Sequence, residues 1–231
     1  MNNDFVSLNI KLHNNHIFIN DGQGLILDTG SPLSFHPSGV IEIGATKIPV
    51  PSYLPELSSD FLHESISDDA KGLLGMDIIS KHVTMIDLRN DLFFINDDAP
   101  YLLEPFHHIH YLIGNLIGVV MQINEKDARM VVDSAATISY IGRNYTIRQE
   151  CVGVAQDFSP YCGRFETTLY ECQTYADPFD VPFILRYGTP PTAVSKILEL
   201  LQVDGILGVD FFKRFRLLIK NGRLFLPQQG I

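Results

Sequence analysis

The sequence predicts a mainly β protein that is built from two related halves and contains short helices. Of its 231 residues, 45% are hydrophobic and only 19% are charged, which is enough apolar material for a folded core. Short runs of Val, Ile, Leu and Phe are separated by turn residues, a pattern typical of β-strands. Long helical periodicity is nearly absent, and one sequence pattern occurs twice.

The duplicated pattern indicates that each half delivers a carboxylate into a tight turn. Residues 25–35 and 130–140 align with an offset of 105 positions, and each apolar run stops at an Asp, a hydroxyl residue and a small residue. That order is typical of a buried strand that enters a turn. A second shared segment follows, with two glycines around two apolar residues, at 72–77 and 205–210. A pseudo-twofold axis could bring the two carboxylates together.

Turn residues divide the chain into predicted strands. The predicted strands are residues 5–12, 16–20, 25–28, 40–43, 46–50, 73–75, 83–87, 92–95, 215–219 and 224–226. The turn at 20–22 joins two of them, and Asn and Gly at 221–222 mark the turn of the last hairpin.

Helices are predicted at three places. Apolar residues at helical spacing predict a helix at 192–201. Shorter helices are predicted after the paired glycine segments, at 77–81 and 210–214. A turn around residues 97–105 sets the predicted boundary between an N-terminal lobe, 1–104, and a C-terminal lobe, 105–231.

These motifs resemble those of the pepsin and retropepsin superfamily of aspartic peptidases. The segment from Asp28 to Ser31 matches the family's Asp-Thr/Ser-Gly-Ser/Thr/Ala motif, and the paired glycine segments match the strand behind each catalytic loop. The resemblance implies a bilobal pepsin-like acid protease fold of two pseudo-twofold-related β lobes. It also implies an aspartic endopeptidase that uses Asp28 and Asp133 as its catalytic pair. Two adjacent carboxylates share one proton, so that one activates water while the other polarises the peptide carbonyl.

The residues beside the two aspartates have supporting roles by the same resemblance. Thr29 and Ser134 supply the hydroxyls that lock the two loops together, and Gly30 permits close backbone approach. Ser31 is expected to donate a hydrogen bond to the outer oxygen of Asp28. By hydrogen-bond count, Asp28 is then the partner with the lower pKa.

Ala135 departs from the family pattern, because it stands where the family has Gly. Its methyl group is expected to crowd the loop or the reacting water. The alternative function is therefore a catalytically weak or inactive pepsin-like module that binds a peptide or protein partner. A third hypothesis is a homodimer in which only Asp28 acts.

The second half contains extra residues that predict a flap. From the Asp to the second glycine of the later segment there are 47 residues in the first half and 75 in the second, a surplus of 28. A long β-hairpin at 151–172 accounts for them. It is predicted to cover the substrate with Phe158 and Tyr161 near its tip and Gly163 in its turn, whereas the first half has no flap. Alternatively, the hairpin packs on the outside of the second lobe as a partner surface.

The charge and the composition of the chain limit the classes of partner that it is expected to bind. The formal net charge of −10 disfavours nucleic acid and anionic membranes, so the expected partner is a polypeptide substrate or a peptide-like ligand. No apolar stretch approaches the roughly 20 residues that span a bilayer, and no leader is visible. A cytoplasmic monomer, with its site between the two lobes, is expected.

No cofactor or metal is expected. The histidines of 107–110 point to both faces of a strand-like segment and fit an interlobe linker better than a metal site. Cys151, Cys162 and Cys172 are interpreted as reduced thiols, with a Cys162 to Cys172 bridge as the alternative.

Overall fold

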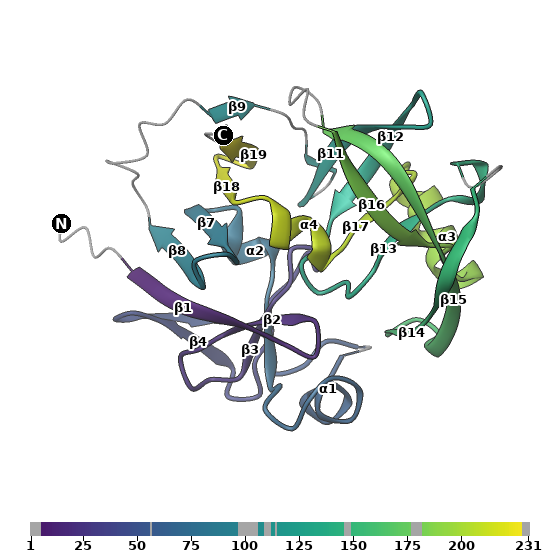
Figure 1. Cartoon of the computed structure of the whole chain (residues 1–231). Helices are drawn as coiled ribbons and strands as arrows, with labels where there is room; N and C mark the ends of the chain where they lie inside the picture. The colour runs from purple at the N-terminus through teal and green to yellow at the C-terminus, as the bar shows by residue number, and fades with distance from the viewer. Residues whose placement is uncertain are drawn as a thin grey trace.

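Two large β-sheets contain most of the described strands (Figure 1). The computed structural model describes residues 6–55, 57–96, 106–108, 112–113, 115–145, 149–176 and 182–227. Within these residues, the strands form a nine-stranded sheet, an eight-stranded sheet and a separate two-stranded hairpin. The protein is mainly β, as its alternating apolar runs and turns predict.

The nine-stranded sheet combines strands from both ends of the chain. In spatial order its strands are β6 (Gly72–Leu74), β3 (Leu25–Leu27), β2 (His16–Ile19), β1 (Val6–His13), β8 (Leu92–Asn96), β7 (Val83–Asp87), β18 (Leu217–Lys220), β19 (Arg223–Pro227) and β9 (Phe106–His108). Strand β18 pairs antiparallel with β7, so the C-terminal hairpin extends the sheet that the N-terminal strands begin. The lobe boundary near residue 104 stays a prediction.

The eight-stranded sheet comes from the second half of the chain. In spatial order its strands are β10 (Leu112–Ile113), β11 (Leu116–Ile123), β12 (Lys126–Val132), β17 (Gly205–Leu207), β13 (Ser139–Ile141), β16 (Pro182–Gly188), β15 (Gly163–Ala176) and β14 (Cys151–Ser159). Strands β14 and β15 form the predicted long hairpin, and β15 continues four residues beyond its predicted end. Gly163 takes a positive φ of 71° at its turn. The separate hairpin joins β4 (Val40–Ile43) to β5 (Thr46–Pro49).

Each copy of the duplicated sequence forms the same strand pair. Strand β3 runs parallel to β6, and β12 runs parallel to β17 in the corresponding register. The backbone N–H of Asp28 donates to the Leu74 carbonyl at 3.0 Å, and that of Asp133 donates to the Leu207 carbonyl at 2.9 Å. Both aspartates therefore stand just beyond a buried strand that a second strand fixes from the side.

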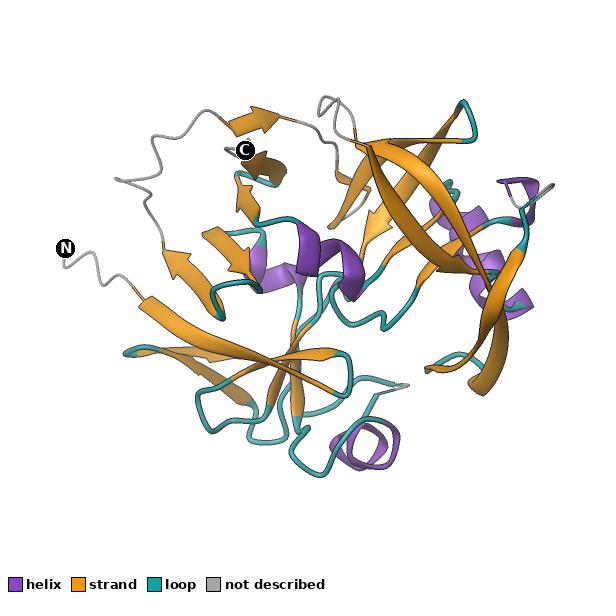
Figure 2. Ribbon diagram, in the orientation of Figure 1, coloured by secondary structure: helices purple, strands orange, loops and turns teal. Residues whose placement is uncertain are grey.

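The helices are short and lie beside the sheets (Figure 2). They are α1 (Ser59–Ser65), α2 (Met76–Ile79), α3 (Thr192–Leu201) and α4 (Val209–Arg214), with a 3₁₀ turn, η1 (Arg143–Tyr145). The bounds of α3 match the prediction, and α2 and α4 follow the glycine segments as expected. Helix α1 was not predicted; the Ser58 hydroxyl caps its N-terminus by accepting from the Phe61 N–H. Among the described helices, none is long and apolar enough to cross a membrane.

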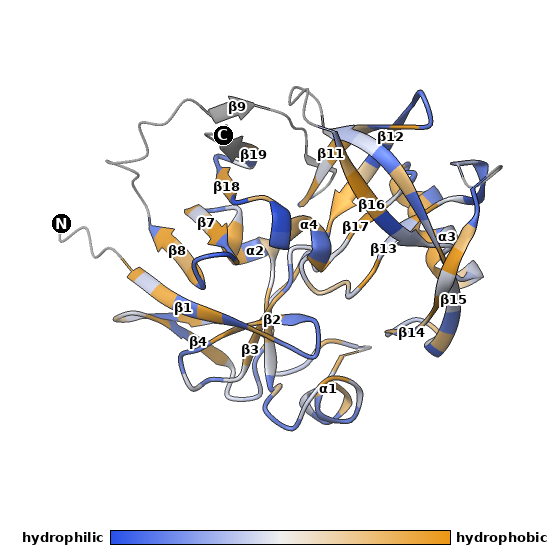
Figure 3. Ribbon diagram, viewed as in Figure 1, coloured by the Kyte–Doolittle hydropathy of each residue, from blue (hydrophilic) through white to orange (hydrophobic). Residues whose placement is uncertain are grey.

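A small apolar cluster supports the first aspartate turn, apart from the main core. Apolar residues run along strands such as β7 and β8 (orange in Figure 3) and join a larger cluster that draws on both sheets. The small cluster consists of Phe18, Ile26, Phe35, Leu62, Ala70 and Leu73. Leu62 belongs to α1, and burying a leucine contributes roughly 1.5–3 kcal/mol. This contact holds α1 beside β3 and hence near Asp28.

Candidate active site

The two aspartate turns are joined by reciprocal hydrogen bonds. The Thr29 N–H donates to the Ser134 hydroxyl at 3.0 Å, and the Ser134 N–H donates to the Thr29 hydroxyl at 3.0 Å. Each hydroxyl in turn donates across to the opposite strand, Thr29 to the Val132 carbonyl at 2.7 Å and Ser134 to the Leu27 carbonyl at 2.6 Å. Both side chains are buried, so these bonds are shielded from water. The position of one turn is therefore set by the other.

The serine that comes next to last in each repeat links its turn to the glycine segment. The Gly75 N–H donates to the Ser34 hydroxyl at 2.8 Å, and the Gly208 N–H donates to the Ser139 hydroxyl at 3.0 Å. A side chain at Gly75 would lie 2.6 Å from the carbonyl oxygen of Leu33, and Gly208 is crowded in the same way. Steric contact thus explains why both segments need glycine.

Gly30 brings the two turns into direct contact. A Cβ atom at this position would overlap the carboxyl group of Asp133, so only glycine fits. Ala135 occupies the corresponding place in the second turn, and its methyl packs against the small cluster. The methyl that sequence analysis expected to crowd the loop is accommodated by an apolar surface.

Burial raises the pKa values of both carboxyl groups, and the charge of a neighbouring aspartate adds to each shift. Burial, followed by the negative charge of Asp133, raises the pKa of Asp28 to about 8, against hydrogen bonds from the Gly30 and Ser31 N–H groups. Burial raises the pKa of Asp133 to about 6, although the N–H groups of Ala135 and Ala136 oppose the shift. The two groups lie close enough to titrate as a pair.

These shifts correct one prediction. The Ser31 hydroxyl donates to the Leu33 carbonyl at 2.7 Å and not to Asp28. Asp133 instead accepts two backbone N–H groups on one oxygen, from Ala135 at 2.9 Å and from Ala136 at 3.1 Å. Backbone N–H groups therefore stabilise the charge of both carboxylates, and the pKa of Asp28 is raised further than that of Asp133, because the charge of Asp133 adds to the effect of burial.

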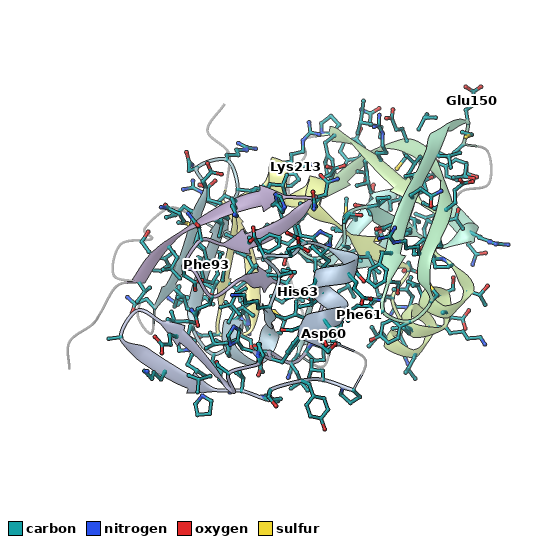
Figure 4. All side chains as sticks on the ribbon, turned by 90° about the horizontal axis from the view of Figure 1, so that it is seen from below. Asp60, Phe61, His63, Phe93, Glu150 and Lys213 are labelled. Carbon is teal, nitrogen blue, oxygen red and sulfur yellow. The ribbon has the colours of Figure 1, made fainter. Side chains whose placement is uncertain are left out.

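The β14–β15 hairpin and α1 both reach the pocket that the two carboxylates line. Phe158 and Tyr161 of the hairpin line this pocket, whereas Gly163 lies at the turn and does not. The Phe158 ring packs on the ring of Phe61 in α1, with centroids 5.0 Å apart. Figure 4 shows Phe61 on the side of α1 that faces the second half of the chain. The hairpin tip thus lies at the site, which contradicts the alternative that it packs on the outside.

A third carboxylate and a helix of the first half also line the pocket, and the sequence predicted neither. Asp157 of β14 lines the pocket, as do Phe61 and Leu62 of α1. The repeat itself held one signal, since Tyr140 carries a hydroxyl that its counterpart Phe35 lacks. That hydroxyl donates to Asp157. For α1 no such signal existed, because the helix is short and lies outside the duplicated segments.

The structure also bears on the histidines and the cysteines of the part of the chain that it describes. No group of three or more His, Cys, Asp or Glu side chains there could hold a metal ion. His107 and His108 lie on β9, and His110 falls outside the described residues. Cys151 and Cys162 are exposed, Cys172 is buried, and all three are free, so the alternative disulfide does not form.

Comparisons with known proteins give a structural neighbour and no family. No family model matches the chain, and no curated protein matches it. Among 68 similar chains of solved structures is the retroviral protease-like domain of Ddi1 from Leishmania major. That domain is 18% identical, and the match covers 50% of this chain and 98% of the domain, with a TM-score of 0.30. A TM-score this low does not indicate a shared function.

Proposed function

We propose that the protein is an aspartic endopeptidase, which hydrolyses peptide bonds with water activated between Asp28 and Asp133. One observation carries the proposal: two copies of one turn are locked together by Thr29 and Ser134, and their carboxyl groups line one pocket. A pair of buried carboxyl groups that share a proton is the arrangement that this hydrolysis requires.

The pKa order assigns the two roles. Between about pH 6 and pH 8 the pair holds one shared proton, and the larger rise in the pKa of Asp28 favours Asp28 as the group that carries it. Asp133 then acts as the general base that takes a proton from water, while Asp28 donates a hydrogen bond to the carbonyl oxygen of the scissile peptide. The proton that the water loses passes through the pair to the leaving amine. The pair returns to its starting state once the products leave.

The pocket favours an extended polypeptide whose reacting bond is covered from both sides. Phe158 and Tyr161 come from the hairpin, and Phe61 comes from α1, so closing these groups over the substrate would expel water from the carboxylates. In this proposal the hairpin is the flap, carried by the second half, and α1 replaces the flap that the first half lacks.

The same proposal includes the pepsin-like arrangement of two lobes, 1–104 and 105–231, with the dyad between them. Both aspartates come from one chain, so a monomer contains the complete site and no cofactor takes part. A cytoplasmic location and a polypeptide partner belong to this proposal as well.

A second function, peptide binding without cleavage, is favoured by a contact between two rings that line the pocket. The rings of Phe61 and Phe158 pack on each other and line the same pocket as the carboxylates, and a chain held there without a well-placed water would not be cut. Ala135 supports this alternative only through its departure from the family motif, because its methyl is accommodated.

The test replaces each aspartate by its amide isostere. Asp28→Asn and Asp133→Asn are each expected to lower hydrolysis of an unfolded protein substrate to background, because an amide cannot transfer the shared proton. The wild-type rate should follow a bell-shaped pH profile with its maximum between about pH 6 and pH 8. Circular dichroism checks that the variants fold.

Full activity in either variant would refute the dyad. A peptide with a statine group, which mimics the transition state, separates the two functions. An endopeptidase binds it more tightly than the matching substrate peptide, whereas a module that only binds peptides shows equal affinity for both.

A further inference from the structure

Asp157 connects the hairpin to the segment that follows the Asp133 turn. One of its carboxylate oxygens accepts from the Thr137 hydroxyl at 2.7 Å, and the other accepts from the Tyr140 hydroxyl. Thr137 and Tyr140 stand four and seven residues after Asp133. The Tyr140 ring also lies 6.1 Å, between centroids, from the ring of Phe165 on β15. Both strands of the hairpin are thus in contact with this segment.

We infer that Asp157 is a positioning residue of the proposed peptidase, which tethers the β14–β15 hairpin to residues 137–140 and so fixes the flap over the dyad. The inference rests on the proposed function for its catalytic consequence. The tether itself does not depend on the proposed function, because it consists of the two hydrogen bonds of Asp157. The next residue, Phe158, packs on Phe61 of α1. Adjacent residues of one strand therefore reach both sides of the pocket.

A carboxylate suits this position better than an amide. Two hydroxyl donors converge on the side chain, and a carboxylate offers an acceptor oxygen to each, whereas an Asn side chain has one acceptor oxygen. Tyr140 is only 4% exposed, so its hydroxyl would lose its partner if Asp157 were shortened. Burial and the neighbouring negative charge keep the pKa of Tyr140 far above its usual value, which keeps the hydroxyl a donor.

The charge of Asp157 also acts on the dyad. Three titratable groups from separate elements face it: Asp133 after β12, Tyr140 on β13 and His16 on β2. Its negative charge helps to raise the pKa of Asp133. Burial lowers the pKa of His16, which leaves that ring neutral near pH 7. The described pocket lining contains no Lys or Arg.

The experiment compares four variants that separate shape from charge. Asp157→Ala removes the tether and its charge, Asp157→Asn removes the charge and one of the two acceptor oxygens, and Tyr140→Phe removes one donor but keeps the charge. Glu166→Gln is the matched control, since Glu166 belongs to the same hairpin, is exposed and accepts a hydrogen bond from Gln156 outside the pocket. For each variant, kcat and KM are measured across pH, and amide hydrogen exchange is measured at residues 158–163.

The tether and the charge predict different changes. Asp157→Ala should lower kcat/KM by roughly 10- to 100-fold, since a displacement of about 1 Å has that effect, and should speed exchange at the tip. Asp157→Asn should move both limbs of the pH profile to lower pH, because the dyad loses a repelling negative charge. Tyr140→Phe should speed exchange without that pH shift, and Glu166→Gln should match the wild type.

Two results would overturn the inference: wild-type exchange at 158–163 in Asp157→Ala, or a pH profile of Asp157→Asn that equals that of Glu166→Gln. A wild-type protein that cleaves nothing would refute the proposed function instead. In that case the tether is still tested by two measurements that need no enzymatic activity: hydrogen exchange at residues 158–163 and the titration of the Asp133 carboxyl ¹³C signal. Thermal melting of Tyr140→Phe, the mildest variant, checks that altered exchange is not general unfolding.

Discussion

At the scale of single residues, the two turns are alike in sequence and unequal in their surroundings. Gly30 faces the carboxyl group of Asp133, while Ala135 faces the small apolar cluster. The motif alone does not show that a methyl group fits at Ala135 in the second turn but not at Gly30 in the first turn. Which methyl is tolerated depends on residues more than 60 positions away in the sequence, such as Leu73.

Adding a methyl should therefore be far more damaging in the first turn than removing one in the second. Gly30→Ala is expected to lower kcat/KM on the order of 100-fold, since its Cβ must displace the Asp133 carboxyl group. It should also lower the free energy of unfolding by roughly 1–3 kcal/mol, as overpacking does. Ala135→Gly, the matched control, should lose only about 1 kcal/mol of stability. Steady-state kinetics and urea titration measure both, and a higher turnover in Ala135→Gly would revive crowding by its methyl.

The residues beside the aspartates show what a motif can and cannot predict. The hydroxyls of Thr29 and Ser134 were assigned from the motif to a lock between the loops, and the structure places hydrogen bonds there. Ser31 was assigned to Asp28 and instead bonds the backbone of its own turn. The motif fixes residue types, but the direction of a hydroxyl depends on which carbonyl lies nearest after folding.

At the scale of elements, the 28 extra residues of the second half predicted the hairpin, whereas no feature of the sequence predicted α1. The β14–β15 hairpin was predicted from the 28 surplus residues and from a turn that contains Gly163, where the structure has a positive φ. Helix α1 has seven residues with one buried side chain, too few for helical periodicity to be recognised. The position of α1 over the pocket depends on Leu62 and Phe61, whose contacts come from other elements.

Trimming residues 158–163 to a two-residue turn tests whether the hairpin is the flap. Turnover is expected to fall by at least about 100-fold, because the carboxylates would then face bulk water, where electrostatic stabilisation weakens. The melting temperature should change little, since the rest of the hairpin stays paired with β16 through β15. The double substitution Val152→Thr and Val154→Thr alters exposed positions of β14 outside the pocket and serves as control. Unchanged turnover after trimming would refute the flap and leave the dyad standing.

At the scale of the whole molecule, long-range pairing is what the sequence could not supply. The C-terminal hairpin was predicted as a local unit, yet β18 pairs with β7, more than 120 residues earlier. Local periodicity carries no information on which edge a strand will join. The glycine segments of β6 and β17 were expected beside the aspartate strands only through the family resemblance, and the structure pairs them there with β3 and β12.

Because both turns belong to one chain and are joined by hydrogen bonds of that chain, a single molecule should be fully active. Specific activity is expected to stay constant on dilution from micromolar to nanomolar protein, and sedimentation should give the mass of a monomer. Mixing Asp28→Asn with Asp133→Asn supplies a sharper test. If chains shared their aspartates, mixed dimers would regain activity, whereas sites complete within each chain stay inactive in the mixture. A homodimer that uses Asp28 twice makes a different prediction again: Asp133→Asn alone would keep its activity and lose it steeply on dilution.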